Sequence, residues 1–256
     1  MTTAETTLDR FLGGRLAIEQ PGRGRHRAGL DAILLAALVP PDAAGHLVDL
    51  GAGVGTAGLA AAIRAPGLRV TLVERDPAAV ALARANAARP ENGLLGRVMV
   101  AEADVTAREA AREAAGLARE SADWVILNPP FFAPGAVNAS PAAARAAAHV
   151  LPEGGLAAWL RTAAALARPG GRLAVVFRAD GLAEILAGLA GRFGAAAVRP
   201  VHPRAGEAAH RILVTATKGS RAAPGILPGL VLHPPGSSRY LDEADAVLRG
   251  EAGLDQ

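Results

Sequence analysis

Residues 49–55, Asp-Leu-Gly-Ala-Gly-Val-Gly, constrain the fold more than any other part of the chain. The apolar residues just before this segment predict a short buried strand, and residues 56–63 favour a helix. Three alternate glycines, Gly51, Gly53 and Gly55, allow a sharp turn in which a ligand can approach uncovered backbone amides. A nucleotide-like cofactor is expected there, because an open parallel sheet binds its ligand at the carboxyl ends of its strands. The alternative is an ordinary tight turn in an α/β protein.

Beyond this turn the chain alternates segments typical of strands and of helices, which predicts an α/β fold with helices on both faces of a parallel sheet. We expect strands at residues 69–73, 97–101, 123–127, 172–177, 195–201 and 211–217. Helices are expected at 32–38, 77–88, 156–167, 182–191 and 241–248, and a helical run after Asp104 should continue to residue 119. Asp31 is expected to cap the first of these helices. The segment between the last two strands is too short for a helical crossover, so these strands should form an antiparallel hairpin.

Composition and missing motifs exclude several classes of chemistry. The 256 residues include no cysteine, which rules out disulfides, thiolate zinc sites and cysteine nucleophiles. The sequence has no Gly-x-Ser-x-Gly, no phosphate loop ending in Gly-Lys-Ser/Thr and no histidine pair at metal-ligand spacing. It also lacks an apolar stretch of about 18 residues, and its first residues lack the apolar core of a signal peptide. We therefore expect a soluble, cytoplasmic protein with no metal and no membrane partner.

Positive charge is carried almost wholly by arginine. The net charge is +3, and Lys218 is the only lysine. Such a balance is compatible with a nucleic-acid partner, although a general enrichment in Ala, Arg, Gly and Pro also accounts for it. Residues 1–28 set arginines among glycines and predict an arm or irregular lead-in. Arg23, Arg25 and Arg27 either follow a phosphate backbone or form a solvated charged segment.

Two acidic residues follow the next two predicted strands. Glu74 stands about 20 residues beyond the glycine turn, where a carboxylate can accept both hydroxyls of an adenosine ribose. This placement suits NAD and S-adenosylmethionine equally. Asp104, after the third strand, can accept a hydrogen bond from the amine of adenine or can cap the turn before Thr106.

The fourth predicted strand ends in Asn128-Pro129-Pro130-Phe131. The exocyclic amine of a nucleobase is a poor nucleophile because its lone pair is delocalised into the ring. Two acceptors, the Asn128 side-chain oxygen and the Pro129 carbonyl, can engage both amine hydrogens and make that lone pair available. Phe131 can then stack on the base. We therefore expect this tetrapeptide to activate a target amine, the alternative being a turn without chemistry.

The order of these motifs resembles class I S-adenosylmethionine-dependent methyltransferases that act on amino groups and carry Asn-Pro-Pro-Phe/Tyr. Residues 29–35, Gly-Leu-Asp-Ala-Ile-Leu-Leu, and the second phenylalanine, Phe132, are most similar to the bacterial tRNA(Val) adenine-N6 methyltransferase family, which modifies the adenine beside the anticodon. The resemblance covers roughly residues 20–220. It implies a Rossmann-like fold with a seven-stranded, mostly parallel sheet in the order 3-2-1-4-5-7-6, in which strand 7 is antiparallel.

The resemblance also implies the functional residues. Residues 1–256 would form a single methyltransferase domain, with an N-terminal arm and helix at 1–43, a Rossmann-like core at 44–218 and a C-terminal extension at 219–256. The catalytic residues would be Asn128, Pro129, Pro130 and Phe131. The residues expected to bind S-adenosyl-L-methionine are Asp31, Asp49, Gly51, Ala52, Gly53, Gly55, Glu74, Arg75, Asp104, Val105 and Asn128.

The expected partner is RNA, with tRNA as the first candidate. Because the pocket takes one base, such a substrate must also be held outside it. Residues 133–155 form a longer connection than most between sheet and helix, and such insertions at the ligand end are often functional. The candidate substrate-binding residues are Phe132, Arg23, Arg25, Arg27, Arg145, His149 and Arg204, with Arg211 near the final hairpin.

Other functions stay open at this point. Relatives with the same tetrapeptide methylate guanine N2 in ribosomal RNA, adenine in DNA or glutamine N5 in release factors, so the tetrapeptide does not fix the substrate. Outside the methyltransferases, the alternatives are an NAD-binding or nucleotide-binding Rossmann protein and an RNA-binding module that has kept the fold.

Overall fold

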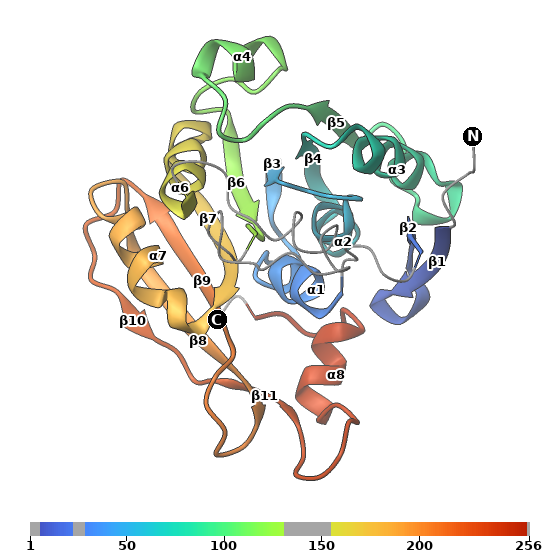
Figure 1. The fold of residues 1–256 in the computed structure, drawn as a ribbon, viewed down its shortest axis with the longest axis vertical. Helices are drawn as coiled ribbons and strands as arrows, with labels where there is room; N and C mark the ends of the chain where they lie inside the picture. The colour runs from blue at the N-terminus through green and yellow to red at the C-terminus, as the bar shows by residue number, and fades with distance from the viewer. Residues whose placement is uncertain (1–5, 23–28, 131–154, 255–256) are drawn as a thin grey trace, which may run out of the picture.

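A computed structural model of the chain describes residues 6–22, 29–130 and 155–254. Within these residues nine strands form one sheet, in the order β10-β8-β9-β7-β6-β3-β4-β5, with β11 also paired to β8 (Figure 1). The strands are β3 (Ala44–Leu50), β4 (Gly67–Glu74), β5 (Val98–Glu102), β6 (Ala122–Leu127), β7 (Ala167–Arg178), β8 (Phe193–Arg204), β9 (Arg211–Lys218), β10 (Gly225–Ile226) and β11 (Leu230–His233).

The sheet has the strand order that the sequence led us to expect. Strands β5, β4, β3, β6 and β7 run parallel to their neighbours, and β9 is antiparallel to both β7 and β8. The β8–β9 hairpin is therefore confirmed. Two short strands, β10 and β11, were not predicted, and they extend the sheet by pairing with β8 in parallel.

Helices cover both faces of the sheet (Figure 1). One core cluster gathers side chains of α1 (Leu30–Ala37), α2 (Thr56–Arg64), α3 (Pro77–Ala88) and α8 (Asp242–Leu248), and the other gathers those of α6 (Gly155–Leu166) and α7 (Leu182–Leu189). Successive residues of one strand enter opposite clusters, as Ile126 and Leu127 do in β6. Because both faces are buried, these strands are continuously apolar rather than alternating.

The parallel strands end together at one edge of the sheet. Leu50 pairs with both Val73 and Leu127, and Glu74 pairs with Glu102. The glycine turn after β3, the acids after β4 and β5, and Asn128 after β6 therefore leave the sheet at neighbouring positions. The expected ligand edge is formed by the elements that the sequence predicted for it.

The irregular lead-in expected at residues 1–28 is wrong for residues 6–21. β1 (Thr6–Phe11) and β2 (Leu16–Pro21) form an antiparallel hairpin, joined by the short 3₁₀ turn η1 (Leu12–Gly14). Leu12, Leu16 and Ile18 are each at most 1% exposed, so the hairpin contributes to the core. The prediction rested on the arginines and glycines of this segment and overlooked these three apolar side chains.

Three smaller differences concern helices. Asp31 does not cap α1, because the cap residue is Gly29 with no side-chain hydrogen bond. The helical run expected to reach residue 119 is limited to α4 (Glu109–Ala114), none of whose residues is buried. The start of β7 lies five residues earlier than expected, at Ala167, where a register irregularity separates its first pairing from the rest.

Candidate active site

The glycine turn folds into a loop fixed by its own backbone. Gly51, Gly53 and Gly55 have φ values of 70°, 55° and 92°, in the left-handed region that favours glycine. The N–H groups of Gly51 and Ala52 both donate to the Val73 carbonyl at 2.9 Å, and the Gly55 N–H donates to the Ala52 carbonyl at 2.8 Å. A Cβ at Gly53 would meet no atom within 4 Å, so this part of the loop is open to a ligand.

Glu74 ties the loop to the end of β4. Its Oε2 accepts the Gly53 N–H at 2.9 Å, and its Oε1 accepts the N–H groups of Arg75 (2.7 Å) and Asp76 (2.9 Å). Three backbone donors therefore fix the direction of the carboxylate. Oε1 already accepts two of these hydrogen bonds, whereas Oε2 accepts one and keeps acceptor capacity that a ribose hydroxyl can use.

Asp49 shapes the loop from inside the protein. It is only 2% exposed, and its Oδ2 accepts the Gly58 N–H at 2.8 Å in the first turns of α2. Burial raises the pKa of Asp49 to about 7; the Gly58 hydrogen bond opposes this, and the nearby charge of Glu74 adds to it. The carboxylate faces α2 rather than open space. In this position it shapes the loop and does not face a ligand.

Arg75 and Asp104 come together beside Glu74. The Arg75 Nη1 lies 3.4 Å from the Asp104 Oδ2. The Asp104 Oδ1 accepts both the N–H and the hydroxyl of Thr106 at 2.7 Å, so the turn that the sequence offered as the alternative is present. Burial alone would raise the pKa of Asp104, but the Thr106 hydrogen bonds and the charge of Arg75 outweigh it and leave the pKa below its usual value. Val105 is 4% exposed and belongs to the core.

Asn128 carries an unused acceptor at the end of β6. Its Oδ1 is buried and has no hydrogen-bond partner among the described residues. The following proline, Pro129, is buried, and Pro130 is half-buried. A buried acceptor without a donor is costly, which makes a ligand donor at this position favourable.

Trp159 was missed by the sequence reasoning. It is one of two tryptophans, lies on α6 and is 7% exposed. A Cβ at Gly51 would lie 2.4 Å from its ring, so the loop rests directly on the indole. Its Nε1 is also buried without a partner among the described residues. A tryptophan on a helix otherwise rich in alanine is the signal that could have drawn attention to it.

Residues expected at the outer part of the site are largely engaged with the chain itself. Asp31 Oδ2 lies 3.0 Å from Arg211 Nε, which joins the start of α1 to the start of β9. Arg204 donates to the Ser237 carbonyl at 3.2 Å and lies 3.6 Å from Glu207. These contacts place both arginines near the ligand edge but use part of their donor capacity. The expected residues that lie outside the described part of the chain are Arg23, Arg25, Arg27, Phe131, Phe132, Arg145 and His149.

The described ranges hold neither a metal-binding group of side chains nor a membrane-spanning helix. Among them, no group of three His, Cys, Asp or Glu side chains is placed to hold a metal ion. Within the same ranges no helix has the length and apolarity needed to cross a membrane.

The curated proteins similar to this chain include methyltransferases named for tRNA and for a release factor. A tRNA1(Val) (adenine(37)-N6)-methyltransferase of Porphyromonas gingivalis strain W83 is 36% identical over 128 residues, which are 48% of each protein. A release factor glutamine methyltransferase of Mycolicibacterium smegmatis is 39% identical over 144 residues, 54% of this chain and 46% of that protein. The matches thus span about half the length of these curated relatives.

Solved structures agree over more of the chain. A protein described as a predicted O-methyltransferase, Atu636 of Agrobacterium tumefaciens, is 39% identical with a TM-score of 0.74, and the match covers 88% of this chain and 98% of that one. The T. thermophilus 16S rRNA N2 G1207 methyltransferase, solved with AdoMet and guanosine, is 26% identical with a TM-score of 0.57, over 84% and 50% of the two chains. The model of the methyltransferase small domain matches residues 28–199, and the chain belongs to that family.

Proposed function

We propose that this protein is an S-adenosylmethionine-dependent N-methyltransferase whose acceptor is the N6 amine of adenine in RNA, with tRNA as the first candidate. The main support for the proposal is the Asn128 Oδ1 at the end of β6, which is buried and has no hydrogen-bond partner among the described residues. It stands one strand away from the glycine loop, since Leu127 and Leu50 are paired neighbours. An acceptor beside a cofactor loop suits a reaction in which an amine must be oriented and polarised.

The loop residues fit S-adenosylmethionine. Gly53 leaves open space where a side chain would stand, and Glu74 holds a carboxylate beside it with acceptor capacity for ribose hydroxyls. Asp104, kept ionised by its low pKa, lies at the next strand end, where it can accept from the adenine amine of the cofactor. The cofactor, when bound, supplies a methyl group attached to a positively charged sulfur.

Asn128 and Pro129 would act on the target amine. One amine hydrogen is donated to the Asn128 Oδ1 and the other to the Pro129 carbonyl, which turns the nitrogen lone pair toward the methyl group. As the N–C bond forms and the S–C bond breaks, the amine nitrogen gains positive charge. Both acceptors then bind its hydrogens more strongly, so their effect is greatest in the transition state. The charge is removed when the methylated amine releases one of its two protons to solvent.

An RNA substrate is supported by the tRNA-modifying and rRNA-modifying relatives and by the Arg-rich composition. Such charge provides phosphate contacts that do not depend on sequence. A second candidate is glutamine-N5 methylation of a release factor, which the similarity to the M. smegmatis enzyme favours. Adenine and glutamine both present a planar –NH₂ group. The Asn128 Oδ1 and the Pro129 carbonyl could therefore accept its two hydrogens in either substrate.

Transfer of a labelled methyl group separates the two candidates. The purified chain is incubated with methyl-labelled S-adenosylmethionine and, separately, with total tRNA, ribosomal RNA and a release factor. Label in the RNA fractions supports the proposal, and label only in the release factor assigns the second candidate. Calorimetry with S-adenosylhomocysteine and with NAD is the matching test of the cofactor; binding of NAD alone would exclude both candidates.

A further inference from the structure

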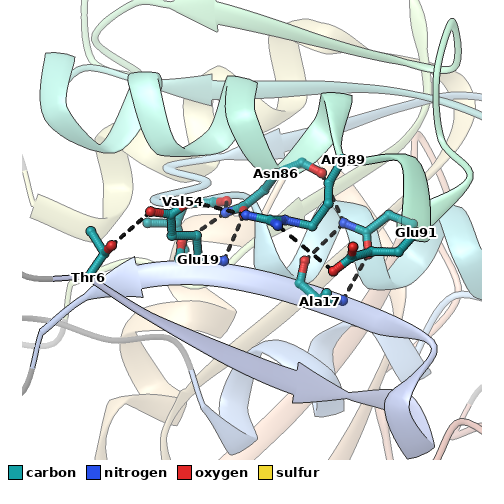
Figure 2. Close-up of polar contacts among 8 residues, drawn as sticks. Thr6, Ala17, Glu19, Val54, Asn86, Arg89 and Glu91 are labelled. Atoms are coloured by element: carbon teal, nitrogen blue, oxygen red, sulfur yellow. Dashed lines mark hydrogen bonds and ion pairs between the residues drawn. The ribbon is translucent and has the colours of Figure 1, made fainter.

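The edge of β2 that faces away from β1 is hydrogen-bonded by two asparagine side chains. Figure 2 shows one of them, Asn86, beside Glu19. Asn86 Oδ1 accepts the Glu19 N–H at 2.8 Å, and Asn86 Nδ2 donates to the Glu19 carbonyl at 3.0 Å. Asn92 treats Ala17 in the same way, at 2.8 and 2.9 Å. Because residues 17 and 19 direct their backbone groups to the same edge, the two amides continue the ladder of the hairpin.

Asn86 makes one further contact that Asn92 does not share. Its Nδ2 also donates to the Val54 carbonyl in the glycine loop, at 3.1 Å. Asn86 is 0% exposed, and both of its N–H groups are used. The additional donation from Asn92 goes to the Asn86 carbonyl, away from the loop. Two carbonyls on one side and an N–H on the other also fix which way the Asn86 amide faces.

Without this contact, the Val54 peptide would be poorly fixed in its orientation. It lies between Gly53 and Gly55, which both have positive φ and offer little steric resistance to rotation. Val54 is 7% exposed, so a carbonyl without its donor would be poorly solvated and the peptide would turn to find water. Such a turn would redirect the neighbouring Gly55 N–H and disturb the Gly53 N–H that donates to Glu74.

We propose that Asn86 is a positioning residue that couples the N-terminal hairpin to the cofactor loop. In holding the Val54 carbonyl, it fixes the loop from the α3 side, while Val73 and Glu74 fix it from the β4 side. Docking of the hairpin and affinity for the cofactor are therefore linked through one buried amide. The cofactor part of this inference rests on the proposed function.

The isosteric pair Asn86→Asp and Asn92→Asp tests the coupling. Each keeps the acceptor for the β2 N–H and loses the donors, so both should lower the temperature of unfolding. Asn86→Asp should in addition raise the Kd for S-adenosylhomocysteine about tenfold or more, whereas Asn92→Asp should change it less than about threefold. Acidic pH should partly restore the affinity of Asn86→Asp relative to wild type, because the introduced carboxyl, once protonated, can donate to Val54 again.

Hydrogen exchange of the ligand-free chain gives a readout that needs no cofactor. Amides of the glycine loop should exchange faster in Asn86→Asp than in Asn92→Asp, in which the Val54 carbonyl keeps its donor. Equal loop exchange and equal Kd in the two variants would overturn the proposal and leave Asn86 a purely structural residue. If Asn86→Asp does not fold, Asn86→Ser supplies the same comparison. A wild-type chain that does not bind S-adenosylhomocysteine would instead contradict the proposed cofactor, while the exchange comparison still decides the role of Asn86.

Discussion

The Gly53 N–H donates to the Glu74 carboxylate at 2.9 Å, across the carboxyl ends of β3 and β4. One side chain thus shapes the loop and also stands where the ribose of an adenosine cofactor would lie. Asn86 performs the complementary task from α3, so the loop is held at two points by side chains that come from different elements.

Replacing Glu74 with alanine should weaken the binding of S-adenosylhomocysteine by about 1.5 to 3 kcal/mol, since charge-assisted hydrogen bonds to the ribose are lost. Glu102→Ala is the matched control, because Glu102 pairs with Glu74 in the sheet but is exposed, with Arg84 at 3.9 Å. Titration calorimetry measures both. An unchanged affinity in a folded Glu74→Ala protein would remove Glu74 from the cofactor site.

The Asp49→Asn variant should gain stability relative to wild type as the pH rises. The pKa of Asp49 is raised from 3.8 to about 7 by burial, so the folded state holds its proton more tightly than the unfolded state does. The contribution of Asp49 to wild-type stability therefore falls between about pH 4 and pH 7 and levels off above that range. The amide keeps an acceptor for the Gly58 N–H and does not titrate. Urea unfolding of both proteins across this range measures how the difference in their free energies of unfolding changes with pH. A difference independent of pH would show that folding does not raise the pKa of Asp49.

Asn128→Ala should lower methyl transfer on the order of 10²-fold or more while leaving the affinity for S-adenosylhomocysteine nearly unchanged. The proposed hydrogen bond is made to the target amine and strengthens in the transition state. Its loss should therefore lower kcat and leave the affinity for the cofactor unchanged. Single-turnover rates and calorimetry measure the two effects separately. Near-normal turnover would mean that the amine is activated by another group.

Removing Arg23, Arg25 and Arg27 together should weaken RNA binding and flatten its salt dependence while sparing cofactor binding. Each lost phosphate contact lowers the slope of log K against log salt by about 0.7 to 0.9. A triple variant of the exposed arginines Arg84, Arg108 and Arg221 is the control for net charge. The same affinity and slope in the arm variant and in wild type would show that these three residues are not phosphate ligands and would favour a protein substrate.

The strands of the main sheet and its final hairpin could be predicted because each signal was local, whereas the strand order was implied by the family resemblance. The glycine turn, the helix of α3 that begins at Pro77 and the short connection before Arg211 are all visible within a few residues. The β1–β2 hairpin could not be predicted in this way. Its apolar side chains pack into the core formed with α1, α2 and α3, and its edge is hydrogen-bonded by Asn86 and Asn92, which lie about 70 residues away in sequence.

The candidate site shows the same division. Glu74 lies at the strand end where the sequence placed it, and Asn128 follows β6 as expected. The contact of Trp159 with Gly51 and the pairing of Asp31 with Arg211 join segments that no local pattern connects. The resemblance implied that Asp49 binds the cofactor, but the direction of its side chain depends on α2, because its Oδ2 accepts a hydrogen bond from the Gly58 N–H.

Methylation of an exocyclic adenine amine can be tested by mass spectrometry of nucleosides from tRNA incubated with the purified chain and S-adenosylmethionine bearing a deuterated methyl group. We expect deuterated N6-methyladenosine with wild type and a strongly reduced yield with Asn128→Ala. Label found on another atom, such as a ribose oxygen or the N2 of guanine, or an equal yield with Asn128→Ala, would contradict this expectation.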